Sequence, residues 1–270
     1  NLQEKQITTL GGNVKSLEIE GTFDDCQRLV KQAFNDKSIN KKLRLSSANS
    51  INIARLLPQM IYYFYAYFNL NITNEKIIFT VPSGNLGNLS AGLFAKKMGL
   101  PVFKFISALN ENRVFENYVN NNVYIPHSSV KTLANAMDVG NPSNIERIMD
   151  LYRNNDAEFR DTVLASSATN NDIITGIKEV YKKYGYIIDP HGAVGYVVTK
   201  KYLNSFTNDT KYVILETAHP AKFFETVEAA LNEKIEIPDR LRRCIDQKKK
   251  TDVLSNDYED FKDYLLSLNK

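Results

Sequence analysis

The chain has 270 residues, of which 43% are hydrophobic and 24% charged, which is ordinary for a globular protein of one large or two small domains. The net charge of +3 is too small to argue for a nucleic-acid partner, and neither a signal peptide nor a membrane-spanning apolar run is found. The two cysteines, Cys26 and Cys244, lie far apart in the sequence. They predict a reducing, cytoplasmic setting without a disulfide framework.

The N-terminal region predicts two short extended pieces within residues 6–20, joined by a turn at Gly11-Gly12-Asn13. A helix follows, with Thr22 as its cap and acidic residues in its first turn. A β-turn-β-α start of this kind, on Asn1 and not on Met, indicates a chain that begins inside a domain of a longer protein.

A serine- and asparagine-rich segment, residues 46–50, predicts the start of a helix that runs to about Asn69. In the plain interpretation, Asn49 or Ser50 only caps this helix. In the functional interpretation, these side chains and the Arg55 guanidinium form an anion site, with Arg55 as a bidentate partner. Taken alone, the segment favours the cap.

Residues 77–100 predict a buried strand, a turn of small polar residues at Ser83–Asn88, and a helix that ends at Gly99. The N–H groups at a helix start have no partner, and small residues let a phosphate approach them closely. The turn is neither a Walker A loop nor a dinucleotide motif, because the required glycine and lysine spacings are absent. On spacing alone, an ordinary tight turn is favoured over a phosphate cradle.

A second buried strand, residues 102–106, completes a strand–helix–strand unit, which predicts a parallel sheet with helices on its faces. Ligands of such sheets sit at the carboxyl ends of the strands, where Ser83–Asn88 lie. A further strand at 211–215 should bring Thr217 and His219 to the same edge. No metal site is predicted, and the basic tail, diluted by acidic residues, indicates a solvated face.

Four blocks of the sequence carry a resemblance that none of them carries alone. They are the 77–100 stretch, Ser50–Arg55 with Leu57-Pro58-Gln59, Ala136–Val139 with Pro142-Ser143-Asn144, and Thr217–Phe223. Together, and in this order, they resemble the threonine synthase family in its long bacterial and fungal branch.

The resemblance implies an α/β fold of the tryptophan-synthase-β type (fold type II), with pyridoxal 5'-phosphate held between two domains. It also implies conversion of O-phospho-L-homoserine and water to L-threonine and phosphate. Carried over to this sequence, the cofactor phosphate would be held by Gly84, Asn85, Leu86, Gly87 and Asn88. Thr217 would hydrogen-bond the pyridine nitrogen. His219 beside it would be structural or would support a residue that touches the ligand. The substrate phosphate would be held by Asn49, Ser50 and Arg55.

One departure from the family pattern concerns catalysis. The family's lysine that binds the cofactor as a Schiff base stands in a Ser/Ala-Phe-Lys-Asp block, and no lysine of this sequence stands in such a block. We therefore expect a C-terminal portion of the enzyme without its catalytic residue, inactive alone and partnered by the missing N-terminal part. Residues 1–40 would end the small domain, and residues 41–270 would form most of the large one.

Two alternatives stay open. A different lyase of the same fold, such as a threonine dehydratase, would not need the phosphate site at Asn49, Ser50 and Arg55. A non-catalytic domain that binds a phosphate ligand would need no lysine.

Overall fold

The computed structural model describes residues 2–70, 72–153 and 155–268. These form two compact units, one built from the segments up to residue 47 and from 236 onward, the other from residues 48–235. No helix within the described ranges is both long and apolar enough to cross a membrane.

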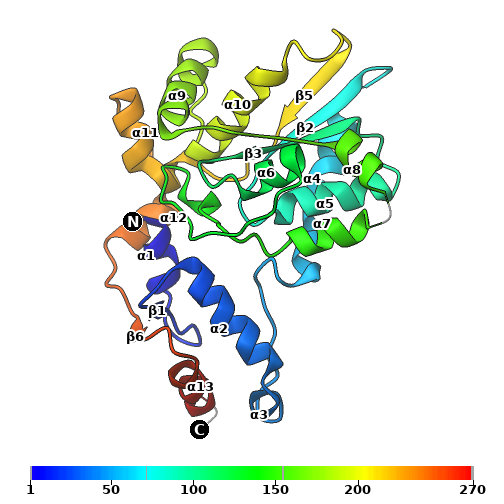
Figure 1. Ribbon diagram of the computed structural model, residues 1–270. Coiled ribbons are helices and arrows are strands. Elements are labelled where there is room, and N and C mark those ends of the chain that lie inside the picture. The colour runs from blue at the N-terminus through cyan, green and yellow to red at the C-terminus, as the bar shows by residue number, and fades with distance from the viewer. Residues whose placement is uncertain (1, 71, 154, 269–270) are drawn as a thin grey trace. The chain divides into compact units, whose positions relative to one another are not determined.

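The larger unit, residues 48–235, is organised around a four-stranded sheet in the order β4-β3-β2-β5, and all its strand pairs are parallel (Figure 1). Its strands are β2 (Lys76–Pro82), β3 (Lys104–Leu109), β4 (Val163–Ser167) and β5 (Thr210–Ile214). The parallel α/β sheet predicted from the strand–helix–strand pattern is thus confirmed.

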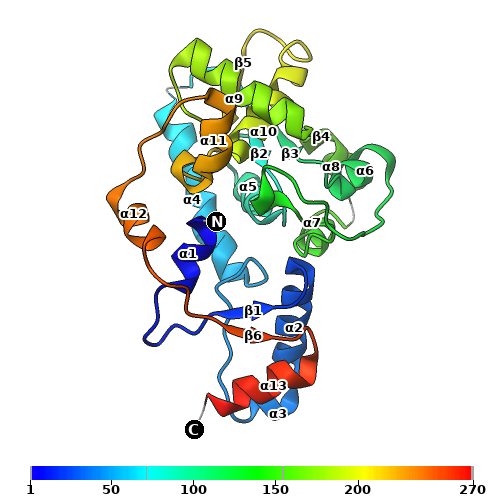
Figure 2. The same ribbon diagram turned by 90° about the vertical axis from the view of Figure 1, so that its left-hand side faces the viewer.

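Helices lie on both faces of this sheet (Figures 1 and 2). The helices and 3-10 turns of the unit are η1 (Ile53–Arg55), α4 (Leu56–Asn69), α5 (Gly87–Lys97), α6 (Val114–Asn121), η2 (Asn135–Met137), α7 (Ile145–Leu151), α8 (Asp156–Thr162), α9 (Asn170–Tyr184), α10 (Pro190–Tyr202), η3 (Pro220–Phe223) and α11 (Phe224–Leu231). Because side chains alternate along a strand, Phe79 packs into the cluster shared with α4–α8, and Ile78 into the cluster shared with α9–α11.

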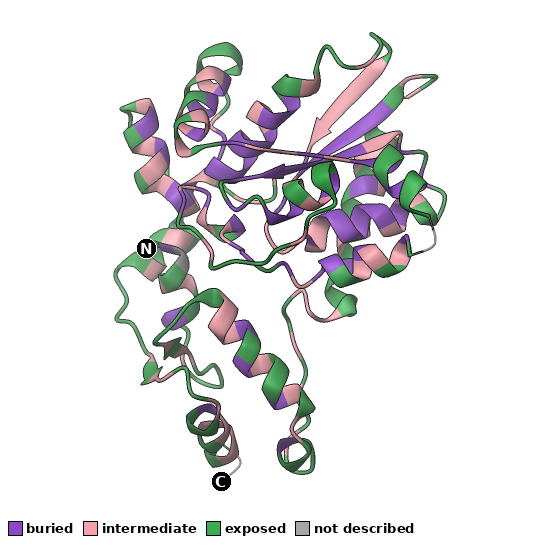
Figure 3. Ribbon diagram, viewed as in Figure 1, coloured by how far each residue is buried: buried purple, intermediate pink, exposed green. Residues whose placement is uncertain are grey.

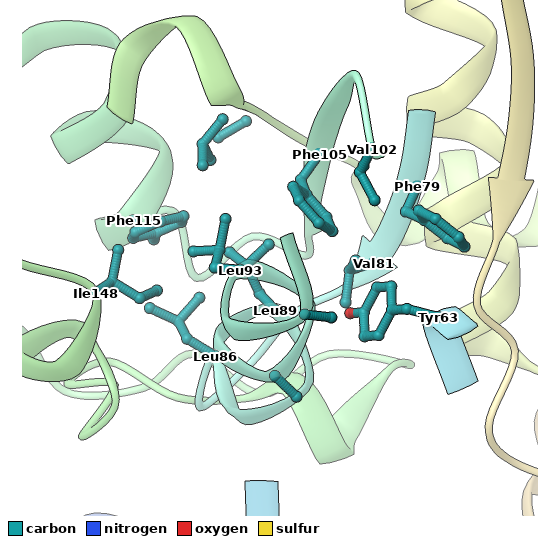
Figure 4. Packing of buried hydrophobic residues seen from close by; sticks show 14 of the residues in the cluster. Tyr63, Phe79, Val81, Leu86, Leu89, Leu93, Val102, Phe105, Phe115 and Ile148 are labelled. Atoms are coloured by element: carbon teal, nitrogen blue, oxygen red, sulfur yellow. The ribbon is translucent and has the colours of Figure 1, made fainter. Parts of the chain in front are cut away.

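The first of these clusters fills the space between the sheet and helices α4 to α8, next to the predicted turn (Figures 3 and 4). The ring of Tyr63 on α4 meets Phe79 and Phe105 edge to face, at centroid distances of 5.0 and 5.8 Å. The Tyr63 hydroxyl donates to the Asn88 carbonyl oxygen at 2.8 Å. Each buried aromatic contributes about 1.5–3 kcal/mol of burial free energy, so α4 and α5 are firmly fixed on the sheet.

The smaller unit pairs the two ends of the chain. It contains α1 (Leu2–Thr8), β1 (Leu17–Ile19), α2 (Phe23–Asn35), α3 (Lys37–Asn40), α12 (Asp239–Ile245), β6 (Asp252–Leu254) and α13 (Tyr258–Ser267). Strands β1 and β6 are parallel neighbours, and Leu29, Ala33, Ile39 and Phe261 form its core.

The smaller unit differs from the sequence prediction in two ways. Residues 2–8, taken in part as an extended piece, form a helix, because Gln, Glu and Lys favour helix and Leu2 finds a buried place. The turn at Gly11 and Gly12 is present, with φ of +69° and +65°. Residues 236–268, part of the segment assigned to the large domain, group with the N-terminal segment, because β6 pairs with β1.

Candidate functional site

The turn between β2 and α5 lies at the carboxyl edge of the sheet, as predicted. Ser83 still pairs with β3, its N–H donating to the Ala108 carbonyl at 2.8 Å, and α5 begins at Gly87. Leu86, the residue before the helix, has a left-handed backbone (φ 58°) and supplies no side-chain cap. The first-turn N–H groups of α5 are therefore left to an outside acceptor, and the helix dipole favours an anion there.

The left-handed backbone of Leu86 is held in place by the packing around its side chain. A left-handed backbone costs a residue with a Cβ atom about 1–2 kcal/mol. The Leu86 side chain is 2% exposed within the cluster under the sheet, and that burial holds the conformation in place (Figure 4). Strain of this kind gathers at ligand-binding turns.

Close neighbours leave little room for a Cβ atom at the two glycines of the turn. A Cβ atom on Gly84 would lie 2.7 Å from the Met137 Cα atom, which is backbone and cannot swing aside. A Cβ atom on Gly87 would lie 3.2 Å from the Ser50 Cβ atom. The turn is thus pressed between the 3-10 turn η2 and the segment that carries Ser50.

Asn85 ties these segments together through its side chain. Its Nδ2 donates to the Ser50 Oγ at 2.6 Å, and its Oδ1 accepts from the Ser143 backbone N–H at 2.7 Å. The Asn144 Nδ2 donates to the Asn85 carbonyl oxygen at 2.8 Å. The structure therefore gives the Asn85 side chain an organising role, because it joins the turn to the Ser50 segment and to Ser143.

Arg147 completes the network and was not singled out from the sequence. Its guanidinium donates to the Asn144 Oδ1 at 2.7 Å and to the Ile51 carbonyl oxygen at 2.6 Å. One signal was available, since Arg147 follows Asn144 by three residues and so shares its helix face. The contact with Ile51 joins distant segments and has no local signal.

The segment around Ser50 is not the predicted helix cap. Asn52 caps the 3-10 turn η1 through its Oδ1, which accepts from the Ala54 N–H at 3.0 Å, and α4 starts only at Leu56. Asn49 instead turns its Oδ1 toward the Ser50 N–H, at 2.5 Å. The structure brings Ser50 to Asn85 and Gly87, while Arg55 lies exposed on η1.

The segment after β5 reaches the same edge of the sheet. The Leu215 N–H donates to the Thr80 carbonyl at 3.0 Å, and the exposed Thr217 follows two residues later. His219 caps η3, its Nδ1 accepting from the Ala221 N–H at 3.1 Å, which is a structural role.

Glu216 lies beside Thr217 and was not identified from the sequence. Its carboxylate accepts from the Asp189 N–H at 3.1 Å and from the Tyr186 hydroxyl at 2.9 Å. Burial raises the pKa of Glu216 to about 7, and the neighbouring Asp189 carboxylate acts in the same direction. The two hydrogen-bond partners of Glu216 are 27 and 30 positions away in the sequence, so the residues next to Glu216 do not predict these contacts.

Taken together, an uncapped helix start, two glycines that permit close approach and a polar segment beside them suit a phosphate ester. The fold defines an α/β protein of the parallel-sheet class, with this turn at the sheet edge where such proteins bind their ligands. Comparison with protein families is more specific. The chain belongs to the family described as pyridoxal-phosphate dependent enzyme, whose model matches residues 2–218, and a model described as threonine synthase, C-terminal, matches residues 192–265.

Curated relatives point the same way. The chain is 42% identical to a threonine synthase of Escherichia coli over 246 residues, which cover 91% of this chain and 56% of that protein. It is 40% identical to a threonine synthase of Haemophilus influenzae over 266 residues, which cover 98% of this chain and 61% of that protein. The chain thus spans about 60% of the length of these relatives.

Solved structures agree on the fold. The crystal structure of threonine synthase from Escherichia coli superposes with a TM-score of 0.93 at 39% identity, covering 99% of this chain and 61% of that one. That of threonine synthase with bound PLP from Brucella melitensis gives 0.83 at 33% identity, covering 99% and 62%.

Proposed function

We propose that the protein carrying this chain converts O-phospho-L-homoserine and water to L-threonine and phosphate with the help of pyridoxal 5'-phosphate. The observation that supports the proposal is the direct contact between the two segments proposed to bind phosphates. The turn at Ser83–Asn88 is bonded to Ser50 through Asn85, at 2.6 Å. A reaction with a phosphorylated cofactor and a phosphorylated substrate needs two phosphate sites close together.

In this proposal the cofactor phosphate lies at the start of α5, against the backbone of Gly84, Asn85, Leu86, Gly87 and Asn88. The uncapped helix start and the close fit at Gly84 and Gly87 support this placement. When bound, the cofactor supplies an electron sink for the substrate's carbon skeleton. Thr217, exposed at the same sheet edge, would hold the pyridine nitrogen by its hydroxyl.

The substrate phosphate would be held by Asn49, Ser50 and Arg55. The exposed Arg55 guanidinium can take two phosphate oxygens in a bidentate pair, and it would stabilise the charge of the phosphate as it leaves. Arg147 holds the Ile51 carbonyl at 2.6 Å and so fixes the backbone beside Ser50. This phosphate site favours the proposed reaction over that of a dehydratase, whose substrates carry no phosphate.

The base that removes protons from the substrate would be a lysine in a Ser/Ala-Phe-Lys-Asp block, which this sequence does not contain, since Asp260 precedes its one Phe-Lys-Asp string at residues 261–263. Covalent catalysis has no first step without its nucleophile, so the 270 residues alone would bind but not react. The same observation favours the second candidate, a phosphate-ligand-binding α/β domain without catalysis. A lysine in a Ser/Ala-Phe-Lys-Asp block, encoded upstream in the same reading frame, would exclude that candidate.

The test uses the complete gene product and the variant Arg55→Ala. We expect the KM for O-phospho-L-homoserine to rise about tenfold or more, since a charged hydrogen-bonding partner is lost, while the bound cofactor stays at wild-type content. Arg153→Ala is the matched control, because Arg153 is paired with Asp150 on an exposed surface. Loss of cofactor with an unchanged KM would show that Arg55 has another role. Absence of threonine formation by the wild-type protein would refute the proposed reaction.

A further inference from the structure

A buried acid–histidine pair lies behind the phosphate-binding turn, and the proposed reaction does not use it. Asp189 is fully buried at the start of α10, and His191 follows it with 8% exposure. The His191 Nδ1 lies 2.5 Å from the Asp189 Oδ1. The imidazole ring also packs against the Phe223 ring, at a centroid distance of 4.5 Å and an interplanar angle of 58°.

The hydrogen bonds define the state of the imidazole. The backbone N–H of Ala136 donates to the His191 Nε2 at 3.1 Å, so Nε2 is an acceptor and carries no proton. The single ring proton must then be on Nδ1, where it is donated to Asp189. The Asp189 carboxylate also accepts from the backbone N–H groups of His191 and Gly192, at 2.8 and 3.4 Å, which fixes its orientation.

The peptide that His191 holds is the one against which the phosphate-binding turn rests. Ala136 and Met137 belong to η2, and a Cβ atom on Gly84 would lie 2.7 Å from the Met137 Cα and 3.2 Å from the Ala136 carbonyl oxygen. The 3-10 turn η2 is thus a spacer between His191 on one side and Gly84 on the other.

The far end of this loop is fastened separately. The Asp138 carboxylate accepts from the Thr132 N–H at 2.9 Å and from the Thr132 hydroxyl at 2.7 Å, and Asn110 donates to it at 2.7 Å. These bonds close the loop on itself and on the end of β3. The His191 contact ties it to α10, so the two attachments have different functions.

We propose that His191 is a positioning residue: as a neutral imidazole oriented by Asp189, it holds η2 against Gly84 and thereby fixes the phosphate-binding turn. The claim that His191 holds η2 against Gly84 rests on the contacts of His191 with Ala136 and of Gly84 with Met137. The part that concerns the cofactor phosphate rests on the proposed function.

The experiment compares His191→Leu with His191→Gln in the 270-residue chain. Leucine fills the space without an acceptor, whereas the glutamine carbonyl can accept the Ala136 N–H. We expect His191→Leu to weaken binding of pyridoxamine 5'-phosphate, measured by calorimetry, by about tenfold, the equivalent of one ordinary buried hydrogen bond. It should also abolish the hydrogen-exchange protection of the Ala136 amide. His191→Gln should restore both to within about threefold of wild type.

The outcomes separate the two parts of the inference. Unchanged Ala136 protection and ligand binding in His191→Leu would overturn it, as would equal losses in both variants. If the wild-type chain binds no pyridoxamine 5'-phosphate, the proposed function fails, while the exchange of Ala136 still decides the positioning role. Nitrogen-15 NMR of the wild-type chain needs no variant, and a protonated Nε2 on His191 would contradict the proposal.

Discussion

The Asn85 Nδ2 donates to the Ser50 Oγ at 2.6 Å, and this bond joins two segments to which the family resemblance assigns two different phosphates. The Ser50 hydroxyl in turn donates to the Asn49 Oδ1 at 3.1 Å. A displacement of Asn85 should therefore also shift Ser50 and Asn49, and the reverse. Cofactor and substrate binding should be coupled through these side chains in the proposed enzyme.

Asn85→Ala should weaken both the fold and phosphate binding. The change leaves the Ser143 N–H and the Ser50 hydroxyl without their Asn85 partner, so we expect the free energy of unfolding to fall by about 1–3 kcal/mol. Urea unfolding measures the loss. Asn85→Asp keeps the acceptor for Ser143 but adds a negative charge, so it should retain more stability than the alanine variant while binding phosphate less well than wild type. Equal stability of wild type and Asn85→Ala would show that the hydrogen bonds of the Asn85 side chain contribute nothing to the free energy of unfolding.

Gly84→Ala should disturb the turn more than Gly87→Ala. The new Cβ atom would meet the Met137 Cα at 2.7 Å in the first case and the Ser50 Cβ at 3.2 Å in the second. Overpacking against backbone costs about 1–3 kcal/mol, whereas the Ser50 side chain can shift by a few tenths of an ångström. Thermal unfolding of the two variants gives the comparison. A milder effect of Gly84→Ala than of Gly87→Ala would contradict the close contact between Gly84 and η2.

Arg147→Lys should not preserve the function of Arg147. The guanidinium serves the Ile51 carbonyl and the Asn144 Oδ1 at once, through Nη2 and Nη1, and an ammonium group cannot span both acceptors with the same geometry. We expect phosphate affinity to fall by about three- to tenfold, because the Ser50 segment becomes less ordered. Arg113→Lys, on the loop before α6, serves as the control. A wild-type affinity in Arg147→Lys would mean that the Ser50 segment is held by other contacts.

Glu216 should give the fold a pH dependence in a defined window. Its pKa is raised from 4.5 to about 7 in the folded protein, chiefly by burial, so the folded state binds the proton more tightly than the unfolded one. The resulting stabilisation is full below pH 4.5 and is lost as the pH rises through 7. After solvent screening of this partly exposed group, we expect an effect of about 1 kcal/mol.

Glu216→Gln isolates this contribution, because it removes the ionisation and keeps an amide of similar size. Unfolding by urea at pH 5 and at pH 8 should show a smaller loss of stability in the variant than in wild type. The same loss in both proteins would assign the pH dependence to other groups.

Much of the local structure could be predicted from the sequence. Thr22 caps α2 together with Asp25, Asp189 caps α10 with Pro190 in its first turn, and α9 ends at Gly185 with a φ of +64°. These outcomes follow from the local preferences of capping residues, proline and glycine. The position of Ser83–Asn88 at the carboxyl edge followed from the parallel sheet.

The remaining features depend on contacts between distant segments. The bond of Arg147 to Ile51, the burial of Glu216 beside Asp189, and the pairing of β6 with β1 join residues far apart in the chain. The residues near each partner in the sequence do not indicate these contacts. Even the cap near residue 50 was displaced to Asn52, because Asn49 and Ser50 interact with each other and with Asn85.

The most direct test of the central claim is a titration of the 270-residue chain with pyridoxamine 5'-phosphate, followed by the backbone amide resonances. We predict that the amides of Gly87 and Asn88 shift on binding, because they are the uncapped first-turn donors of α5. The start of α9 is the internal control, since Thr169 and Asp172 already cap it. Unmoved resonances at Gly87 and Asn88, or equal shifts at the start of α9, would contradict a phosphate site at this turn.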